Sequence, residues 1–373
     1  MMEYITKYVG LDVSKEKIAV GVAEEGRSKA RYIGMIPYTV EAIRKLISKL
    51  GMPEQLQFCY EAGPTGYGLY RLLKSMDIEC DVVAPSLIPQ KPGDRVKTDK
   101  RDALNLATLY RSGELTPIYV PTEDDEALRD LVRAREDVKE DELRAKQRLI
   151  KFLLRKEIKT PQGTKRWTVK YWDWLDSLKN WNRSASRVAF QEYLQQVKEC
   201  QQRLKVLEQE IKEQANEGVH APMIQKLMTL RGVAVITATS LVAEIMSFER
   251  FQTPNQFMAY NGLVPSESSS GDLRRLGNIT KAGNRHVRKL LIEAAWSYRY
   301  QPAVKGELKK RQQGQPTNIL NISWKAQNRL HKNYFRLLGR GKESGKAITA
   351  VARELAGFIW AIANESDTET QAH

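Results

Sequence analysis

The chain of 373 residues has little cysteine and histidine and no long apolar run, and these shortages exclude several classes of protein. Its three cysteines are scattered, and no C-x-x-C or H-E-x-x-H pattern occurs, which argues against a disulfide framework and a zinc site. The longest apolar stretch, LAGFIWAIA, is too short to span a bilayer. The N-terminal MMEYITKYVGLDV lacks a basic region followed by an apolar run, so we expect a cytoplasmic protein without a signal peptide.

Negative charge is also scarce relative to positive charge. The net charge is +15, and the excess is concentrated between Gly271 and Lys346, where 18 Lys and Arg stand against 4 Asp and Glu. Within this region Lys325, Arg329, Lys332 and Arg336 follow at helical spacing and predict a basic stripe on one helix. Such a one-sided excess favours nucleic acid as a partner over a merely solvated surface, and we expect the first three of these cations to contact it.

Strands and helices alternate in the first third of the chain. Residues 4–23 predict two strands joined by a turn, a helix follows over 39–50, and LQFCYEAG at 56–63 is typical of a buried strand. A helix, a strand and a second helix over 99–113 complete the pattern. This alternation predicts an α/β domain with a mixed sheet over residues 1–125.

Apolar residues repeat every seven positions in the middle of the chain. The first run contains Leu131, Val138, Ala145 and Phe152, and the second contains Phe190, Val197, Leu204 and Ile211. These heptads predict two long helices, over 126–158 and 187–215, that pair as an antiparallel coiled-coil hairpin or form a seam between subunits. We assign residues 126–222 to this coiled-coil region.

Four tryptophans lie between the two heptad runs, among Lys and Arg. They are Trp167, Trp172, Trp174 and Trp181. Stacking on nucleobases is one interpretation. The small core of an insertion is the other, and it is the one we favour.

Residues 223–373 predict a mainly helical domain. IQKLMTLRGVAVITATSLVAEI, at 224–245, predicts two helices joined by a tight turn at Gly232. This pattern is typical of a phosphate-binding helix-hairpin-helix and equally of a plain helical hairpin. A polar loop rich in Ser and Gly follows, and a further helix begins near Asn284.

Four acids stand where predicted strands end and a predicted helix begins. Asp12 and Glu61 each end a strand, and Asp99 and Asp102 lie one helical turn apart. One interpretation of the second pair is a helix start, with Asp99 as the N-cap. The other is that all four carboxylates meet at one edge of the sheet around Mg²⁺ or Mn²⁺, the ions that hard oxygen ligands select. Two such ions can polarise a phosphodiester.

Four sequence blocks occur in a characteristic order over residues 4–120 and 224–295. They are YVGLDVSKEKIAVGV, YEAGPTGYG, KTDKRDALNLA and GLVPSESSSGDLRRLGNITKAGNRHVRKLL. Together they resemble an insertion-sequence transposase family with an N-terminal RuvC-like DEDD domain and a C-terminal serine domain. This family is described as bridge-RNA-guided serine recombinases and is related to Piv-type DNA invertases. The resemblance implies a RuvC/RNase H-like fold for the first domain and a DNA transposase that cuts and rejoins strands.

The resemblance also implies roles for individual residues. Its metal-binding catalytic acids correspond to Asp12, Glu61, Asp99 and Asp102. Its catalytic serine precedes a glycine after the GL-P turn and corresponds to Ser270. Ser268 and Ser269 stand beside it, so a shift of one or two positions remains open. A serine nucleophile would form a phosphoserine link to DNA, and the nearby cations that would neutralise the developing charge are Arg274, Arg275, Lys281 and Arg285.

The partners that the resemblance implies are donor and target DNA, a noncoding guide RNA, and further copies of the chain in a dimer or tetramer. A nucleoid-associated location in the cytoplasm would follow. Two other functions remain open. The four acids would also suit a junction resolvase that uses metal and water alone, and the positive charge would also suit a nucleic-acid-binding protein without activity. An actin- or sugar-kinase-like ATPase also opens with GLDVSKEKIAVGV, but its later phosphate loops are missing from this sequence.

Overall fold

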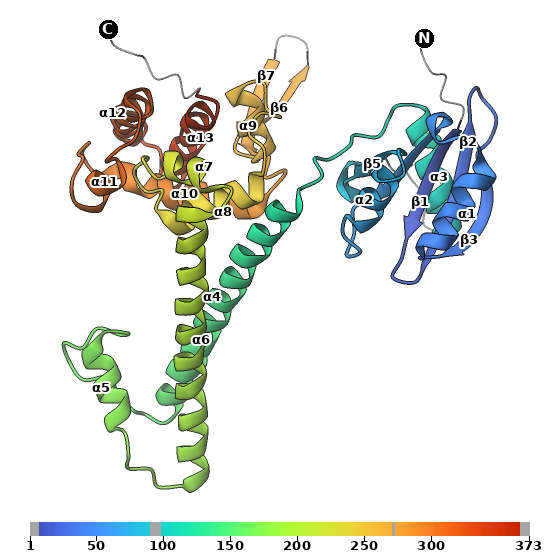
Figure 1. The fold of residues 1–373 in the computed structure, drawn as a ribbon. Helices are drawn as coiled ribbons and strands as arrows, with labels where there is room; N and C mark the ends of the chain where they lie inside the picture. The colour runs from blue at the N-terminus through green and yellow to red at the C-terminus, as the bar shows by residue number, and fades with distance from the viewer. Residues whose placement is uncertain (1–6, 90–97, 271–272, 366–373) are drawn as a thin grey trace. The chain divides into compact units, whose positions relative to one another are not determined.

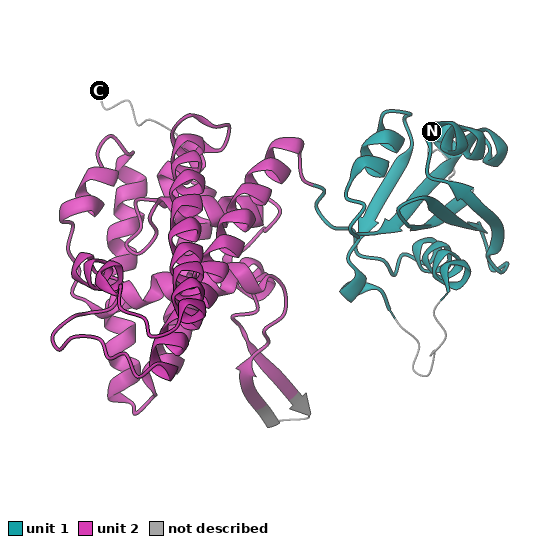
Figure 2. Ribbon diagram, turned by 90° about the horizontal axis from the view of Figure 1, so that it is seen from below, with its two compact units in different colours: residues 1–120 teal, residues 121–373 magenta. Residues whose placement is uncertain are grey.

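The computed structural model describes residues 7–89, 98–270 and 273–365. The chain forms two compact units, residues 1–120 and 121–373, which are teal and magenta in Figure 2. The first boundary lies close to the predicted end of the α/β domain. The predicted coiled-coil and C-terminal domains fall in one unit, because both long helices enter the core of the C-terminal helices.

The first unit is built on a five-stranded sheet in the order β3-β2-β1-β4-β5 (Figure 1). The strands are β1 (Lys7–Val13), β2 (Lys17–Glu24), β3 (Arg31–Pro37), β4 (Leu56–Glu61) and β5 (Glu79–Val83). The first three are antiparallel neighbours, whereas β4 is parallel to β1 and β5 is parallel to β4. The predicted mixed sheet is confirmed, and the α/β domain is consistent with a RuvC-like fold.

Helices cover both faces of this sheet. They are α1 (Val40–Leu50), α2 (Gly68–Lys74) and α3 (Asp99–Arg111), with short 3-10 turns η1 (Pro53–Gln55) and η2 (Pro85–Leu87). Side chains of α1 and α2 share a core with Val9 and Leu11 of β1. On the opposite face Leu106 of α3 packs against Cys59 and Val83.

Two glycines let α3 lie directly on the sheet. Gly10 of β1 and Gly21 of β2 are paired across the two strands. A Cβ atom added to either glycine would lie 2.5 Å from the Ala103 carbonyl oxygen of α3. The helix backbone therefore occupies the space that any side chain at these two positions would need.

We expect Gly10→Ala and Gly21→Ala each to lower the free energy of unfolding by about 1–3 kcal/mol, because the colliding atoms belong to the α3 backbone and cannot rotate away. Urea unfolding of the full chain would measure the loss. Gly68→Ala is the matched control, since its added methyl group would meet only the Tyr38 hydroxyl, at 4.0 Å. A Gly10→Ala protein as stable as the Gly68→Ala protein would contradict the close contact.

Two long helices begin the second unit, and they confirm the predicted helix pair. α4 (Glu123–Arg155) and α6 (Ser184–Glu217) pack along each other in antiparallel directions (Figure 1). Leu128 of α4 shares one core with Ile211 of α6, and Phe152 shares another with Phe190. The pairing within one chain confirms the hairpin and leaves the seam between subunits as a prediction.

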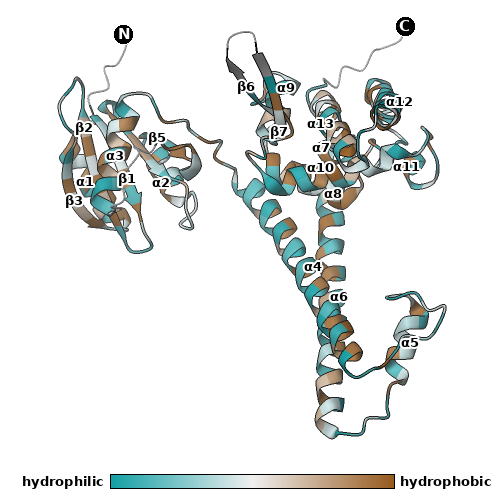
Figure 3. Ribbon diagram, turned by 180° about the vertical axis from the view of Figure 1, so that it is seen from behind, coloured by the Kyte–Doolittle hydropathy of each residue, from teal (hydrophilic) through white to brown (hydrophobic). Residues whose placement is uncertain are grey.

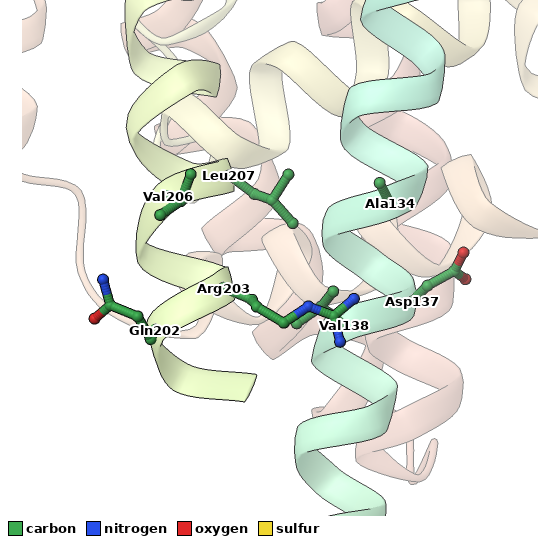
Figure 4. A pocket seen from close by; sticks show the side chains of 7 residues that line it. All are labelled: Ala134, Asp137, Val138, Gln202, Arg203, Val206 and Leu207. Atoms are coloured by element: carbon green, nitrogen blue, oxygen red, sulfur yellow. The ribbon is translucent and has the colours of Figure 1, made fainter. Parts of the chain in front are cut away.

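The outer surface of this helix pair keeps a groove. Figure 3 shows α4 as largely hydrophilic, with hydrophobic residues recurring along it. The groove has a volume of about 470 Å³ and is lined by Ala134, Asp137, Val138, Gln202, Arg203, Val206 and Leu207 (Figure 4). Val206, at its rim, is 61% exposed. An apolar surface beside the heptad positions therefore stays open after the two helices have paired.

The four tryptophans form the small core that we favoured over stacking on nucleobases. α5 (Val169–Ser177) lies near the end of the helix pair, with Tyr171 and Leu175 buried. The four indoles are half-buried and pack against the cluster that contains these two residues and Phe152 and Phe190. They stabilise the insertion where α4 ends and α6 begins.

The C-terminal part of the second unit is helical, as predicted. Its elements are α7 (Ala221–Leu227), α8 (Val235–Ile245), α9 (Pro254–Tyr260), α10 (Arg285–Ala295), η3 (Trp296–Arg299), α11 (Gly306–Arg311), α12 (Thr317–Gly339) and α13 (Ser344–Ala363). α13 lies in the core, with Val351, Leu355 and Ile359 fully buried. Among the described residues, no helix is apolar enough over the length that a membrane crossing requires.

The predicted helical hairpin at 224–245 is present as α7 and α8, and its turn faces protein. Gly232 has φ +82°, and a Cβ atom there would overlap the Ala294 carbonyl oxygen. Arg231, beside it, donates hydrogen bonds to the carbonyl oxygens of Tyr300 and Gln301. The glycine is thus explained by packing against the end of α10, as in a plain helical hairpin.

The predicted polar loop is wrong in its secondary structure. Residues of this stretch form two antiparallel strands, β6 (Pro265–Ser270) and β7 (Leu273–Ile279), that project from the helices (Figure 1). Serines and arginines supply no alternation of apolar and polar side chains, so the usual strand signal is missing. Backbone pairing joins the two strands.

Candidate functional site

Asp12 and Glu61 lie side by side at the carboxyl ends of two parallel strands. β1 and β4 pair with Leu11 opposite Tyr60, so the next residue on each strand is the acid. Gly10 faces α3, and Cys59 of β4 contacts the Leu106 carbonyl oxygen of α3 at 3.8 Å. Because side chains alternate along a strand, both half-buried acids belong to the α3 face of the sheet.

α3 brings the other two acids to the same edge. Tyr110, near its end, packs edge-on against Tyr8 at the start of β1, with ring centroids 5.9 Å apart. Ala103, nearer its beginning, lies on Gly10 further along β1. The helix therefore runs antiparallel to β1, and its first turn, with Asp99 and Asp102, lies toward the carboxyl end of that strand.

The alternative reading of Asp99 as the N-cap is wrong. Thr98 is the cap, and its hydroxyl accepts a hydrogen bond from the Arg101 amide at 3.3 Å. Asp99 is the first helical residue, and both acids lie in the first turn, where the helix dipole stabilises negative charge. A helix start explains their presence in part, but capping does not require either of them.

The fit of these residues to a divalent metal is incomplete. The donor chemistry fits, because four carboxylates on one face and edge of a sheet are the hard oxygen ligands that Mg²⁺ and Mn²⁺ prefer. Within residues 7–89, 98–270 and 273–365, however, no three His, Cys, Asp or Glu side chains are gathered closely enough to hold an ion. The ends of β1 and β4 and the first turn of α3 lie toward one edge of the sheet, and the gathering of the four acids into one ligand set stays a prediction.

Ser270 is the last residue of β6, at the outer end of the hairpin. It pairs with Leu273, while Ser269 pairs with Arg274 and Ser268 with Arg275. Gly271, which follows it, lies outside the described residues. All three candidate serines thus lie on one strand, directly opposite the first residues of β7.

The base of the hairpin is held by bonds to the turn before it. The Lys281 amide donates to the Gly262 carbonyl oxygen at 3.1 Å. Arg288 of α10 donates to the carbonyl oxygens of Asn261 and Ala282, at 3.1 and 2.9 Å. Gly283 has φ +66° and lies so close to Tyr260 that no side chain would fit.

Three of the predicted cations are exposed around this hairpin. Arg275 lies on β7, Lys281 follows the strand, and Arg285 is the first residue of α10. The side chain of Arg274 lies outside what the structure describes. The predicted helix near Asn284 is confirmed, since Asn284 is the N-cap of α10 and accepts from the His286 and Val287 amides.

A buried acid that the sequence analysis missed holds this cap in place. Glu244 of α8 has a side chain only 2% exposed. Its carboxylate accepts two hydrogen bonds from Arg133 of α4, at 2.7 and 3.0 Å, and one from the Asn284 amide group, at 2.7 Å. It therefore joins α4 and α8 to the segment where the hairpin ends and α10 begins. A single acid inside the apolar run VITATSLVAEI was the available signal.

The pKa of the Glu244 carboxyl reflects these bonds. Burial alone would raise it, but the hydrogen bonds from Arg133 and Asn284, with the charges of Arg133 and His286, outweigh burial and lower the pKa below its usual value. An acid with a lowered pKa stabilises the fold above the unfolded-state pKa, about 4.3, and this contribution is lost as the pH falls through the folded-state value.

The predicted basic stripe is also present. Lys325, Arg329 and Lys332 are exposed on α12. They line a groove of about 530 Å³ with Asn328, Asn333, Arg336 and Glu354. Arg329 forms an ion pair with Glu354 of α13 at 2.9 Å, so the stripe includes one cation that is already engaged.

Comparison with known proteins identifies the family. Residues 224–307 match the pattern described as transposase IS116/IS110/IS902 family, and residues 9–156 match the transposase DEDD domain of the IS110 type. A putative transposase, y4qE, of Sinorhizobium fredii is 45% identical over 370 residues, which cover 99% of this chain and 91% of the relative. The transposase for insertion sequence element IS1533 of Leptospira borgpetersenii is 35% identical over 347 residues, 90% of this chain and 98% of the relative.

The chain belongs to the IS116/IS110/IS902 transposase family. It is a DNA transposase, and the readings as a nucleic-acid-binding protein without activity and as a kinase-like ATPase are wrong. The DEDD match at 9–156 includes all four acids, and the match at 224–307 includes Ser270 and its neighbouring cations. A DEDD domain indicates use of a divalent metal, in agreement with the donor chemistry of the acids.

We expect Glu244→Gln to lower the free energy of unfolding at pH 7 by about 1–3 kcal/mol, because charged hydrogen bonds at a buried carboxylate are lost. The lower part of this range applies, since the Arg133 side chain is 55% exposed. The difference in the free energy of unfolding between the wild type and Glu244→Gln should become smaller as the pH falls below about 4.3. Urea midpoints from pH 7 to pH 3 would measure it. Glu249→Gln, at an exposed acid nearby, is the control; an unchanged difference across this range would contradict the role of the Glu244 charge.

Proposed function

We propose that this transposase cuts and rejoins DNA through a covalent link between Ser270 and a DNA phosphate, with Asp12, Glu61, Asp99 and Asp102 as the metal-binding acids. The observation that carries the proposal is that two parallel strands and the antiparallel helix α3 have their acid-bearing ends toward the same edge of the sheet. The position of Ser270 at the outer end of a projecting hairpin supports the second half of the proposal.

The acids and the serine would divide the reaction between them. The Ser270 oxygen attacks the scissile phosphorus, the bond from phosphorus to the sugar oxygen breaks, the serine proton passes to a carboxylate, and the leaving sugar oxygen takes up a proton. Bound Mg²⁺ or Mn²⁺ would supply charge that stabilises the attacking and leaving oxygens. The hydroxyl of another strand then attacks the phosphoserine and releases the serine. The exposed Arg275, Lys281 and Arg285 would attract the phosphate.

Two further parts of the proposal concern partners. The family resemblance supports a homo-oligomer in which the serine of one copy completes the acidic site of another, and the open groove between α4 and α6 offers an apolar surface for it (Figure 4). The resemblance and the positive charge between 271 and 346 support a noncoding guide RNA. Light scattering of the active complex and sequencing of copurified RNA test these parts; an active monomer or a protein free of RNA would refute them.

We expect Ser270→Ala to keep DNA binding and to lower recombination by about 10³-fold or more, because the attacking atom is lost while positioning remains. Denaturing gels should show a DNA–protein adduct in the wild type and none in Ser270→Ala, and mass spectrometry should locate it on the peptide that contains residues 266–274. Ser268→Ala and Ser269→Ala are the matched controls. Attachment at Ser268 or Ser269 would identify that serine as the nucleophile. If DNA is cleaved without an adduct, and Ser270→Ala cleaves it equally well, the result would favour a metal-only resolvase.

Removing any one of the four acids should stop strand cleavage and leave folding and DNA binding intact. We expect Asp12→Asn, Glu61→Gln, Asp99→Asn and Asp102→Asn each to slow cleavage by about 10²–10³-fold, the usual loss when a group that stabilises developing charge is removed. Cleavage of a labelled duplex at graded Mn²⁺ concentrations would measure the rates. The exposed Glu41 of α1, changed to Gln, is the control. Full activity of the Glu61→Gln protein would reduce the site to three acids.

A further inference from the structure

The exposed face of α12 carries two large aromatic side chains. Trp324 is 47% exposed and Phe335 is 50% exposed. They are eleven residues apart, which is three helical turns and about 16 Å, so both rings lie along the same edge of the helix. Single exposed aromatic residues are common on proteins, but two in line on one helix edge form a surface.

This aromatic edge borders the basic groove. Asn328, which lines the groove, lies one turn after Trp324 on the same edge, and its side chain donates to the Trp324 carbonyl oxygen at 2.9 Å. Lys325 and Lys332 lie on the adjoining side of the helix. Among the described residues that line the groove, Glu354 is the single acid.

Both carboxylate oxygens of Glu354 are engaged within the groove. One forms the ion pair with Arg329, and the other accepts a hydrogen bond from Asn333 at 2.7 Å. Asn333 in turn accepts from Arg336 at 2.7 Å. This chain of contacts fixes the inner wall of the groove, while the two lysines give its outer side a positive charge.

We propose that this face of α12 binds single-stranded DNA, with Trp324 and Phe335 stacking on unpaired bases and Lys325 and Lys332 contacting phosphates. Aromatic rings beside a basic groove are the combination that single strands use, because every base offers a flat face for stacking. Bases within a duplex are already stacked on one another, so a ring can stack on them only by parting two base steps, which costs free energy of stacking. The lysines alone would bind single-stranded DNA and duplex DNA alike, and the two aromatic rings are what favours the single strand.

DNA is the occupant to which the family's activity points, since cutting and exchanging strands separates bases that were paired. The inference rests on the family's activity on DNA and is independent of Ser270 and the four acids. α12 (Thr317–Gly339) also lies outside both segments that match the family patterns, 9–156 and 224–307. The surface therefore lies outside the two family patterns but within the part of the chain that aligns with the relative from Sinorhizobium fredii.

Fluorescence anisotropy with the full-length protein would test the assignment. The probes are labelled oligonucleotides of about 16 nucleotides, the upper end of the range for one single-strand site, as single-stranded DNA, as duplex, and as RNA of the same sequence. We expect Trp324→Ala and Phe335→Ala each to weaken binding of single-stranded DNA by about tenfold. Duplex binding should stay unchanged. Trp324→Phe and Phe335→Tyr keep a ring and should restore single-strand binding.

The lysines should behave differently from the rings. Lys325→Ala with Lys332→Ala should weaken both DNA forms and reduce the slope of log affinity against log salt by about 0.7 per lysine for the single strand. Lys170→Ala on α5 removes one exposed cation elsewhere and is the matched control. Circular dichroism would verify that each variant is folded.

Three results would overturn the proposal. They are unchanged single-strand binding in the Trp324→Ala/Phe335→Ala double variant, an equal loss for duplex and single strand, and a larger loss of RNA binding than of DNA binding in that double variant. Lys170→Ala serves as the internal reference and should bind single-stranded DNA as the wild type does. Binding is measured without strand cleavage, so failure of the serine mechanism and failure of this surface remain separate findings.

Discussion

The direct contact of α3 with β1 and β2 is the constraint on which the candidate acidic site depends. Gly10 and Gly21 leave no side chain between sheet and helix, and the Ala103 carbonyl lies where their Cβ atoms would be. This contact fixes the direction of the helix along β1, and Tyr110 against Tyr8 fixes its register. Only with that direction do acids from residues 12, 61, 99 and 102 share one edge. The glycines are therefore as necessary to the proposed site as the acids.

In the second unit the buried Glu244, through hydrogen bonds, helps to fix the segment that carries the proposed nucleophile. The described side chains of the β6–β7 hairpin are mostly exposed, and Ile279, at the end of β7, packs against the core, so the position of the hairpin depends on its base. There Asn284 caps α10, Glu244 holds Asn284, and Arg133 of α4 holds Glu244. A buried carboxylate with partners from two helices tolerates little rearrangement, because an unpaired charge in the core is costly. The long helix pair is thereby tied to the segment that carries the proposed nucleophile.

The features that could be predicted from the sequence are those that a periodic pattern of residues reveals. The mixed sheet, the paired helices and the basic stripe on α12 all follow repeats of two, seven or four residues. The sequence did not predict β6 and β7, because PSESSSGDLRRLGNI has no apolar alternation, nor the role of Glu244, because its partners Arg133 and Asn284 are 111 and 40 residues away. Thr98 as the cap of α3 was missed for a smaller reason: Asp99 is equally suited to capping, and only the helix start decides between them.

The distribution of charge between the two units bears on how the reaction is divided. The four candidate acids lie in the first unit, and two of them share the first turn of α3 with Lys100 and Arg101. The proposed nucleophile lies in the second unit, on a strand that pairs with the arginines of β7. Carboxylates repel a phosphate until cations neutralise them, but a hairpin bearing Arg275 attracts one without help. DNA binding by the second unit would therefore not depend on metal, and metal would be required only where the strand is cut. The separation of binding from cutting follows from the chemistry of the two surfaces, whichever copy of the chain supplies each.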